Sequence, residues 1–115
     1  MMRKIEKPWG HELIWAETDK YVGKILFIKE GEKLSRQYHV KKEETLLIQR
    51  GEMRLEIGDD ANRLTLHMHP GNVFHITPGT IHRMVATTDV EVVEVSTPEL
   101  DDVVRLEDSY GRAQS

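Results

Sequence analysis

The sequence predicts an all-β protein, built as an antiparallel sandwich or barrel, and three observations lead to this prediction. Apolar and polar residues alternate over short stretches, as in Met53, Leu55 and Ile57 around Arg54 and Glu56. Such stretches recur along the chain, and Gly or Pro separates many of them. Only the part of the chain after residue 96 has the features of a helix.

The expected strands cover residues 11–15, 21–29, 34–40, 45–49, 53–57, 64–69, 73–77, 81–86 and 90–95. Residues 7–10 form a turn before the first of them. The stretch 21–29 has apolar residues on both faces, which indicates burial on both sides. Thr97 as a cap, Pro98 at the first helical position and the acidic residues that follow predict a short C-terminal helical segment.

The composition fits one small domain covering residues 1–115, with 38% hydrophobic residues to form its core. No apolar run approaches the roughly 18 residues of a membrane span, and the first residues lack the apolar core of a signal peptide. Cysteine is absent, so we expect no disulfide and a cytoplasmic location. The net charge of −4, with acids and bases interspersed, argues against a nucleic-acid surface but allows a basic pocket for an anionic substrate.

Gln37, His39 and Glu44 are the first candidate metal ligands. Gln37 and His39 are two residues apart, so they leave the same face of a strand. A turn through the charged residues 40–43 would bring Glu44 back beside His39, and His82 would complete the site from a later segment. Such nitrogen and oxygen donors bind divalent ions, so we predict one metal ion: zinc, or else cobalt, nickel or manganese.

The spacing of these residues resembles the two motifs of the cupin family. The first motif matches Gly31, Gln37, His39, Glu44 and Gly51, with Gln37 where most cupins carry His. The second matches Gly71, Gly79 and His82, with Pro78 one place later than usual and Ala86 in place of the customary Asn. The resemblance implies a cupin-type antiparallel β-barrel or jelly roll, also called a double-stranded β-helix.

A more specific likeness runs from Lys7 to Arg112. Its segments are Lys7-Pro8-Trp9-Gly10, Tyr21 with Lys24, residues 31–39, residues 78–83, Glu94-Val95, residues 101–105 and residues 108–112. Together they resemble the type II phosphomannose isomerases, the cupin domain at the C-terminal end of bifunctional mannose-1-phosphate guanylyltransferases. The nucleotidyltransferase part of those proteins has no counterpart in the sequence, so the resemblance does not imply sugar-nucleotide synthesis.

The resemblance implies a metal-dependent sugar-phosphate isomerase that interconverts mannose 6-phosphate and fructose 6-phosphate. It implies that Gln37, His39, Glu44 and His82 hold the metal. Arg105, Arg112 and Lys24 match its substrate-handling arginines and its strand lysine, so we predict these three as catalytic residues. We favour Lys24 for proton transfer, with Glu44 and His75 as alternatives. Arg36 and Arg83 are further candidates to bind the phosphate, because a guanidinium fits a phosphate group.

Departures from the family pattern leave other functions open. Val40, Lys41 and Leu46 replace histidines and an aromatic residue, and His75 replaces a tyrosine. A non-catalytic cupin that binds a metal and a sugar is therefore an alternative, and a cupin oxygenase is a less favoured one. We expect no nucleic-acid or membrane partner. We do expect a homodimer, because small barrels have open sheet edges that tend to pair.

Overall fold

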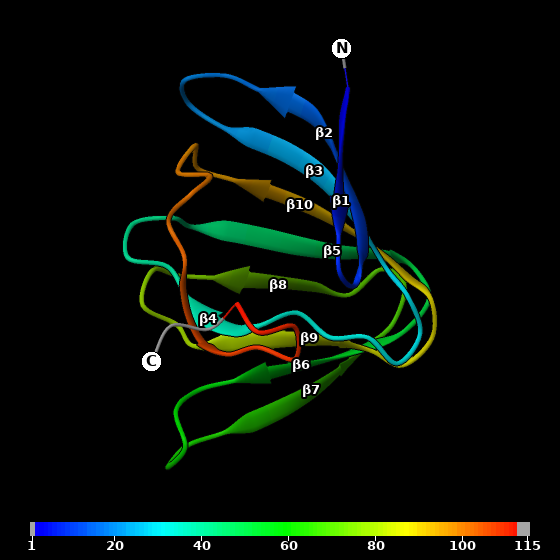
Figure 1. Ribbon diagram of the computed structural model, residues 1–115, viewed down its shortest axis with the longest axis vertical. Helices are drawn as coiled ribbons and strands as arrows, with labels where there is room; N and C mark the ends of the chain where they lie inside the picture. The colour runs from blue at the N-terminus through cyan, green and yellow to red at the C-terminus, as the bar shows by residue number, and fades with distance from the viewer. Residues whose placement is uncertain (1, 113–115) are drawn as a thin grey trace.

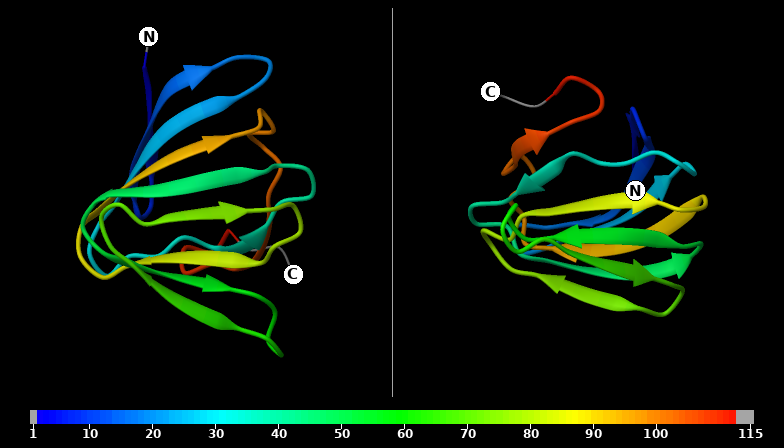
Figure 2. Two further views of the ribbon diagram at one scale, coloured as in Figure 1. Left: turned by 180° about the vertical axis from the view of Figure 1, so that it is seen from behind. Right: turned by 90° about the horizontal axis from the view of Figure 1, so that it is seen from below.

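The computed structural model of the protein describes residues 2–112, in which eleven strands form two antiparallel sheets. The strands are β1 (Arg3–Lys7), β2 (Gly10–Glu17), β3 (Val22–Ile28), β4 (Arg36–Tyr38), β5 (Glu44–Arg50), β6 (Met53–Ile57), β7 (Leu64–Met68), β8 (Val73–Ile76), β9 (His82–Ala86), β10 (Val90–Ser96) and β11 (Val104–Glu107). One sheet has the order β1-β2-β3-β10-β5-β8 and the other β11-β4-β9-β6-β7. The two sheets enclose the core (Figures 1 and 2), which confirms the predicted all-β antiparallel architecture.

Along β3 and β10 the inward-facing positions change from apolar to charged within one strand. Leu26 and Val92 belong to the hydrophobic core and are no more than 2% exposed. Lys24 and Glu94 lie two positions away, on the same faces, and are also buried. Glu44 at the start of β5 repeats this pattern. The barrel interior therefore has an apolar part and a charged part.

Strand pairing brings residues that are distant in the sequence into one region. β4 and β9 pair through Gln37 opposite His82, and β11 places Arg105 opposite Gln37 on the other side of β4. In the six-stranded sheet, β3 and β10 place Lys24 opposite Glu94. The site residues of both sheets thus come from the inward faces of short, paired strands.

The turn before β9 is fixed by Gly79, whose φ of 82° lies in the left-handed region that favours glycine. The N–H of Gly79 donates to the carbonyl oxygen of His39 over 2.7 Å. The turn that leads into His82 is therefore tied to the other candidate histidine ligand.

The predicted C-terminal helical segment is wrong: residues 2–112 contain no helix, and a turn at residues 100–101 leads instead into β11. An isolated helix of about ten residues is marginal in water, whereas β11 pairs with the otherwise open edge of β4 and satisfies its backbone groups. In Figure 1 this C-terminal segment passes from the six-stranded sheet to the five-stranded one.

β1 was not expected either, because Ile5 is its only apolar residue. Pairing with β2, from Arg3 opposite Ile14 to Lys7 opposite Gly10, holds it in place. None of the described residues belongs to a helix long and apolar enough to cross a membrane.

Candidate metal centre and adjoining cavity

His39, Glu44 and His82 converge inside the barrel, and their candidate ligand atoms all lie within 4.8 Å of one another. Nε2 of His39 is 3.6 Å from Oε2 of Glu44, and Nε2 of His82 is 3.5 Å from Oε1 of Glu44. Both Nε2 atoms are buried without a hydrogen-bond partner within residues 2–112, and Oε2 of Glu44, also buried, lies 3.0 Å from the Lys42 ammonium. Since buried polar atoms are almost always satisfied, two unsatisfied imidazole nitrogens that face one buried carboxylate fit a shared cation.

The other ring nitrogen of each histidine is held by the backbone. Nδ1–H of His39 donates to the carbonyl oxygen of Asp102 over 2.6 Å, and Nδ1–H of His82 donates to that of Thr80 over 2.8 Å. A carbonyl oxygen can only accept, so the proton of each ring is on Nδ1 and Nε2 is free to coordinate. Metal-ligating histidines in proteins have this arrangement.

The electrostatics also suit a cation. Burial lowers the pKa of His39, which favours the neutral imidazole that coordinates metals. Burial alone would raise the pKa of Glu44, but His82 and the Lys42 ammonium outweigh it and lower the pKa to about 2. The group therefore offers an ionised carboxylate from Glu44 and imidazole nitrogens from the two histidines, a set compatible with a divalent metal ion.

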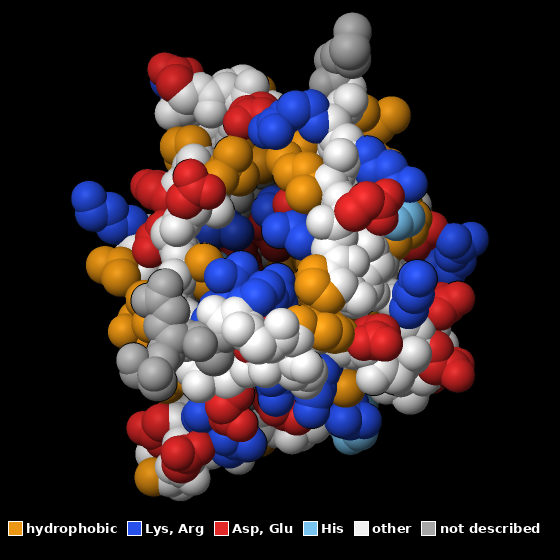
Figure 3. All heavy atoms as spheres, viewed as in Figure 1, with side chains coloured by type: hydrophobic (Ala, Val, Ile, Leu, Met, Phe, Trp, Pro, Cys, Tyr) orange, Lys and Arg blue, Asp and Glu red, His pale blue; other side chains and the backbone are white. Residues whose placement is uncertain are grey.

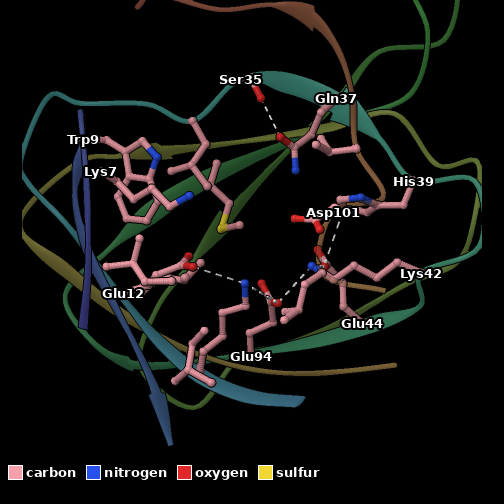
Figure 4. A pocket seen from close by; sticks show the side chains of 18 of the residues that line it. Lys7, Trp9, Glu12, Ser35, Gln37, His39, Lys42, Glu44, Glu94 and Asp101 are labelled. Atoms are coloured by element: carbon pink, nitrogen blue, oxygen red, sulfur yellow. Dashed lines mark hydrogen bonds and ion pairs between the residues drawn. The ribbon is translucent and has the colours of Figure 1, made fainter. Parts of the chain in front are cut away.

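Gln37 lies next to this group and lines the cavity. Its Oε1 accepts a hydrogen bond from the Ser35 hydroxyl over 2.5 Å, and its amide nitrogen points into the cavity (Figure 4). A half-turn of the amide would direct its oxygen inward, while the Ser35 hydroxyl accepts from the amide nitrogen instead. Coordination by Gln37 is compatible with this position and stays a prediction.

A cavity of about 250 Å³ adjoins the three candidate ligands. Its wall includes residues of β1, β2, β3, β10 and β5 from the six-stranded sheet, residues of β4 and β9 from the five-stranded sheet, and residues of the C-terminal segment. The view in Figure 3 shows a hollow near the middle of this face, with Lys and Arg side chains around it. The cavity is therefore suited to a small anionic ligand.

A chain of buried ion pairs leads from Glu12 to Glu44 along the cavity wall. Lys24 lies 3.5 Å from Glu12 and 3.9 Å from Glu94, and Lys42 lies 3.2 Å from Glu94 and 3.0 Å from Glu44 (Figure 4). Burial opposes the charge on Lys42, but Glu94 and Glu44 outweigh it and raise its pKa. Burial and the nearby Glu44 raise the pKa of Glu94. We call these five residues the ion-pair chain.

Lys24, Arg105 and Arg112, predicted as catalytic, all line the cavity. The guanidinium of Arg112 is paired with Asp108, at 2.8 Å from Nε and 3.0 Å from Nη2, and lies 5.5 Å from the centre of the Tyr110 ring. Nε of Arg105 is buried without a hydrogen-bond partner, and no carboxylate of residues 2–112 forms an ion pair with Arg105. Arg105 is thus the more available of the two arginines.

Arg36 and Arg83, predicted to bind substrate, are not among the residues that line the cavity. Arg36 lies 3.1 Å from Glu107 and 3.2 Å from Asp60, while Arg83 donates to the carbonyl oxygens of Leu34 and Glu107. Each arginine is adjacent to a ligand residue, Gln37 or His82, and neighbours in a strand point to opposite faces. Both arginines therefore attach β11 to the other strands of the five-stranded sheet.

His75 lies outside the cavity as well. Its side chain is 52% exposed and lies 2.5 Å from Glu43. His75 could take part in proton transfer only if its side chain faced the interior of the barrel, and it does not.

Residues 97–103 hold the turn between the candidate ligands His39 and Glu44. Sequence reasoning did not identify this supporting segment. The Asp102 carboxylate accepts hydrogen bonds from the backbone N–H groups of residues 40, 41 and 42, over 3.0, 2.6 and 2.9 Å. These bonds lower the pKa of Asp102. Thr97 and Glu43 exchange two more hydrogen bonds, each of 3.0 Å. The segment, hereafter the strap, thus fixes the turn that joins His39 to Glu44.

Asp101 in the strap was also missed as a site residue. It lines the cavity, and its carboxylate points inward (Figure 4). The sequence signal was weak, because two adjacent acids after a proline are more often a solvated turn, and this region was expected to be helical. Lys42 was missed for a similar reason, since the charged residues Lys41 and Glu43 flank it, and Glu12 lies in an expected strand whose inward face the sequence did not identify.

Comparison with known proteins now identifies the family. The family described as mannose-6-phosphate isomerase C-terminal matches residues 1–108. The chain belongs to this family. The relatedness predicted from the sequence is confirmed.

Two relatives illustrate how this mannose-6-phosphate isomerase C-terminal domain occurs elsewhere. Mannose-1-phosphate guanylyltransferase ManC of Salmonella typhimurium is 31% identical over 117 residues, covering 97% of this chain and 24% of the relative. Xanthan biosynthesis protein XanB of Xanthomonas campestris pv. campestris is 30% identical over 115 residues, covering 96% of this chain and 24% of the relative. The chain therefore spans about a quarter of the length of these relatives.

Solved structures share the fold at lower identity. KdgF from Halomonas sp. has a TM-score of 0.72 at 20% identity and covers 88% of both chains. CapF from Staphylococcus aureus has a TM-score of 0.77 at 17% identity, covering 93% of this chain and 33% of that one. A Klebsiella pneumoniae protein with a double-stranded β-helix domain has a TM-score of 0.72 at 18% identity, covering 92% and 86%. The predicted cupin fold is confirmed.

Proposed function

We propose that the protein is a metal-dependent sugar-phosphate isomerase that interconverts mannose 6-phosphate and fructose 6-phosphate. The observation that carries the proposal is that two unsatisfied histidine nitrogens, from His39 and His82, converge on the Glu44 carboxylate beside a cavity with basic side chains on its wall. Membership of the mannose-6-phosphate isomerase C-terminal family supports the choice of a phosphorylated sugar.

In this proposal His39, Glu44 and His82 hold one divalent ion, with Gln37 as a fourth ligand. Zinc, cobalt, nickel and manganese all accept such nitrogen and oxygen donors. When bound, the ion supplies Lewis-acid stabilisation of the negative charge that develops on the substrate oxygens. The backbone bonds to Nδ1 of both histidines keep the two rings oriented for this role.

Arg105 and Arg112 are proposed to bind the phosphate of the substrate. Lys7 supports them, because it lines the same cavity, its ammonium points inward (Figure 4), and no acid of residues 2–112 forms an ion pair with it. A phosphate held by guanidinium and ammonium groups would keep the sugar chain directed at the metal ligands. The contacts of Arg36 and Arg83 favour an indirect role, in which they position β11 and therefore Arg105.

A role for Lys24 in proton transfer stays a prediction. Its place between Glu12 and Glu94 also supports a second role, in which the ion-pair chain orients the hydroxyl groups of the sugar. The guanylyltransferase activity in the names of the relatives is not part of the proposal, because the chain spans about a quarter of their length.

Metal analysis followed by a panel of sugar phosphates tests the proposal. Protein with one equivalent of metal should convert mannose 6-phosphate to fructose 6-phosphate, and His39→Ala should lose metal and activity together. Thermal stabilisation by the sugar phosphate without product, at full metal occupancy, would favour a non-catalytic binding cupin. Oxygen uptake with Fe(II) and not with zinc would favour an oxygenase.

We also propose a homodimer. The strands β1, β8, β11 and β7 end the two sheets, and Val73 in β8 is 60% exposed beside the 39% exposed Leu47 in β5. An open edge with apolar side chains next to it favours pairing between chains. Light scattering measures the mass in solution, and a monomer would contradict the proposal.

A further inference from the structure

We propose that Asp101 is the catalytic residue that carries the proton between C2 and C1 of the sugar phosphate. This inference rests on the isomerase function proposed above and names the group that performs its central step. An aldose–ketose isomerase must remove a proton from the carbon next to a carbonyl and return it to the neighbouring carbon. That step requires a base that faces the substrate and is not engaged by another charge.

Four carboxylates line the cavity, and three of them are already engaged. Glu12 is paired with Lys24, and Glu94 lies within 4 Å of both Lys24 and Lys42. Glu44 faces the two histidines and is paired with Lys42. The remaining one, Asp101, forms no side-chain hydrogen bond or ion pair with any residue from 2 to 112. Its oxygens are therefore available to a ligand in the cavity.

The strap places this carboxylate near the metal ligands. The backbone carbonyl of the next residue, Asp102, receives the hydrogen bond from His39, and consecutive Cα atoms are about 3.8 Å apart. Figure 4 shows the Asp101 carboxylate directed into the cavity into which Gln37 also points. If the oxygens of the sugar approach the ion, the carbons of the sugar would lie between the Asp101 carboxylate and the metal ligands.

The backbone on both sides of Asp101 is held in place by hydrogen bonds, although the side chain of Asp101 is exposed. The strap is attached to the ligand turn before Asp101, through Thr97 and Glu43, and after it, through Asp102 and residues 40–42. Its own turn is closed by a bond from the N–H of Val103 to the Asp101 carbonyl, 3.1 Å long. Because the strap is attached on both sides of Asp101, the carboxylate is held in a fixed place relative to the cavity, as proton transfer requires.

The proposed step balances without any further reactant. The C2–H bond of the open-chain aldose breaks, its proton passes to Oδ of Asp101, and its electron pair forms the C1=C2 double bond while the carbonyl electrons move to O1. The carboxylic acid of Asp101 then returns the proton to C1. The hydroxyl proton of O2 passes to O1, and C2 becomes the carbonyl carbon of the ketose.

Asp101→Asn is the decisive variant, because it keeps the size of the side chain and removes its basicity. We expect kcat for mannose 6-phosphate to fall roughly 10²- to 10⁴-fold. In deuterated water, exchange of the C2 proton should fall by the same factor. Metal content, melting temperature and affinity for glucitol 6-phosphate, which has no carbonyl, should not change. Added formate should restore part of kcat to Asp101→Ala.

Two further variants complete the design. Asp19→Asn removes a carboxylate from the β2–β3 turn, outside the cavity lining, and should leave kcat unchanged. Lys24→Gln tests the competing assignment: it should raise KM more than it lowers kcat if Lys24 only orients the substrate. Loss of C2 exchange in Lys24→Gln, with Asp101→Asn still active, would overturn the assignment of Asp101.

The possible failures are distinguishable. A fully metal-loaded wild-type protein that isomerises no sugar phosphate overturns the proposed function, and the role of Asp101 with it. An active wild type with Asp101→Asn within threefold of its kcat overturns only the role of Asp101. Loss of metal or of glucitol 6-phosphate binding in Asp101→Asn would make Asp101 a structural residue and also overturn the proposal.

Discussion

The imidazole of His39 donates a hydrogen bond to the backbone carbonyl oxygen of Asp102, which lies 63 residues later in the chain and 2.6 Å away. The side chain of Asp102 binds three consecutive N–H groups of the turn between His39 and Glu44. One residue therefore orients a ligand ring through its carbonyl group and fixes the ligand turn through its carboxylate.

Asp102→Ala should weaken metal binding although the side chain is not itself a ligand. The substitution leaves three N–H groups of the ligand turn without their acceptor, so the geometry between His39 and Glu44 is less well defined. Loss of such supporting contacts typically lowers metal affinity about 10- to 100-fold. Competition with a chromophoric chelator measures this affinity, and Asp19→Ala provides a surface control. An unchanged dissociation constant would contradict the supporting role.

The lowered pKa of His39 predicts acid-sensitive stability in the metal-free protein. Below about pH 6.5 the unfolded chain protonates this histidine while the folded protein still resists protonation, so the free energy of unfolding falls as pH decreases. One such group contributes at most about 1.4 kcal/mol per pH unit. Urea titrations from about pH 7.5 to about pH 5 measure the slope. His39→Gln should flatten the slope, and equal slopes for both proteins would refute this explanation.

Arg105→Ala should weaken binding of an anionic ligand without loss of the fold. Arg105 has a buried Nε with no partner, so the guanidinium is available to a phosphate. The loss of hydrogen bonds to a charged group predicts a dissociation constant for glucitol 6-phosphate roughly 10- to 100-fold higher. Calorimetry measures this constant. Arg50→Ala, which removes an exposed arginine outside the cavity lining, should leave it unchanged. Equal affinities for Arg105→Ala and the wild type would place the phosphate elsewhere.

Lys42→Met should destabilise the metal-free protein far more than Lys41→Met, its exposed neighbour. Lys42 lies between Glu44 and Glu94, so its removal leaves two buried carboxylates without this cation. Breaking a buried ion pair from one side costs about 3–5 kcal/mol. Urea denaturation gives the free energies of unfolding. Adding Glu94→Gln to Lys42→Met should recover part of the loss, and a double variant no better than the single one would count against the ion-pair explanation.

The strands and the convergence of His39 and Glu44 were predictable because their signals are local. Alternation identifies strands such as 53–57 directly, and the spacing of Gln37, His39 and Glu44 lies within one strand and one turn. The same alternation predicts that Arg36 and Arg83 do not line the cavity, because each is adjacent to a candidate ligand and neighbours in a strand point to opposite faces. Residue type alone suggested a phosphate-binding role for them.

The ion-pair chain was not predictable from the sequence. Glu12, Lys24, Glu94 and Lys42 come from segments far apart, and only the pairing of β2, β3, β10 and β5 brings them together. The strap was missed for a different reason. Its proline and acids favour a helix start locally, but β4 offers an open edge, and strand pairing there outweighs local propensity.

The strap joins two parts of the cavity wall that would otherwise be independent. Of the candidate ligands, Glu44 and His82 begin strands of the two sheets and His39 directly follows β4, whereas Asp101, Arg105 and Arg112 all follow β10 in one continuous stretch. A change of length between Thr97 and Asp101 would displace Asp101 together with Asp102, whose carbonyl and carboxylate hold His39 and the turn after it. We therefore expect the length of this stretch to alter the shape of the cavity and the position of His39 at the same time.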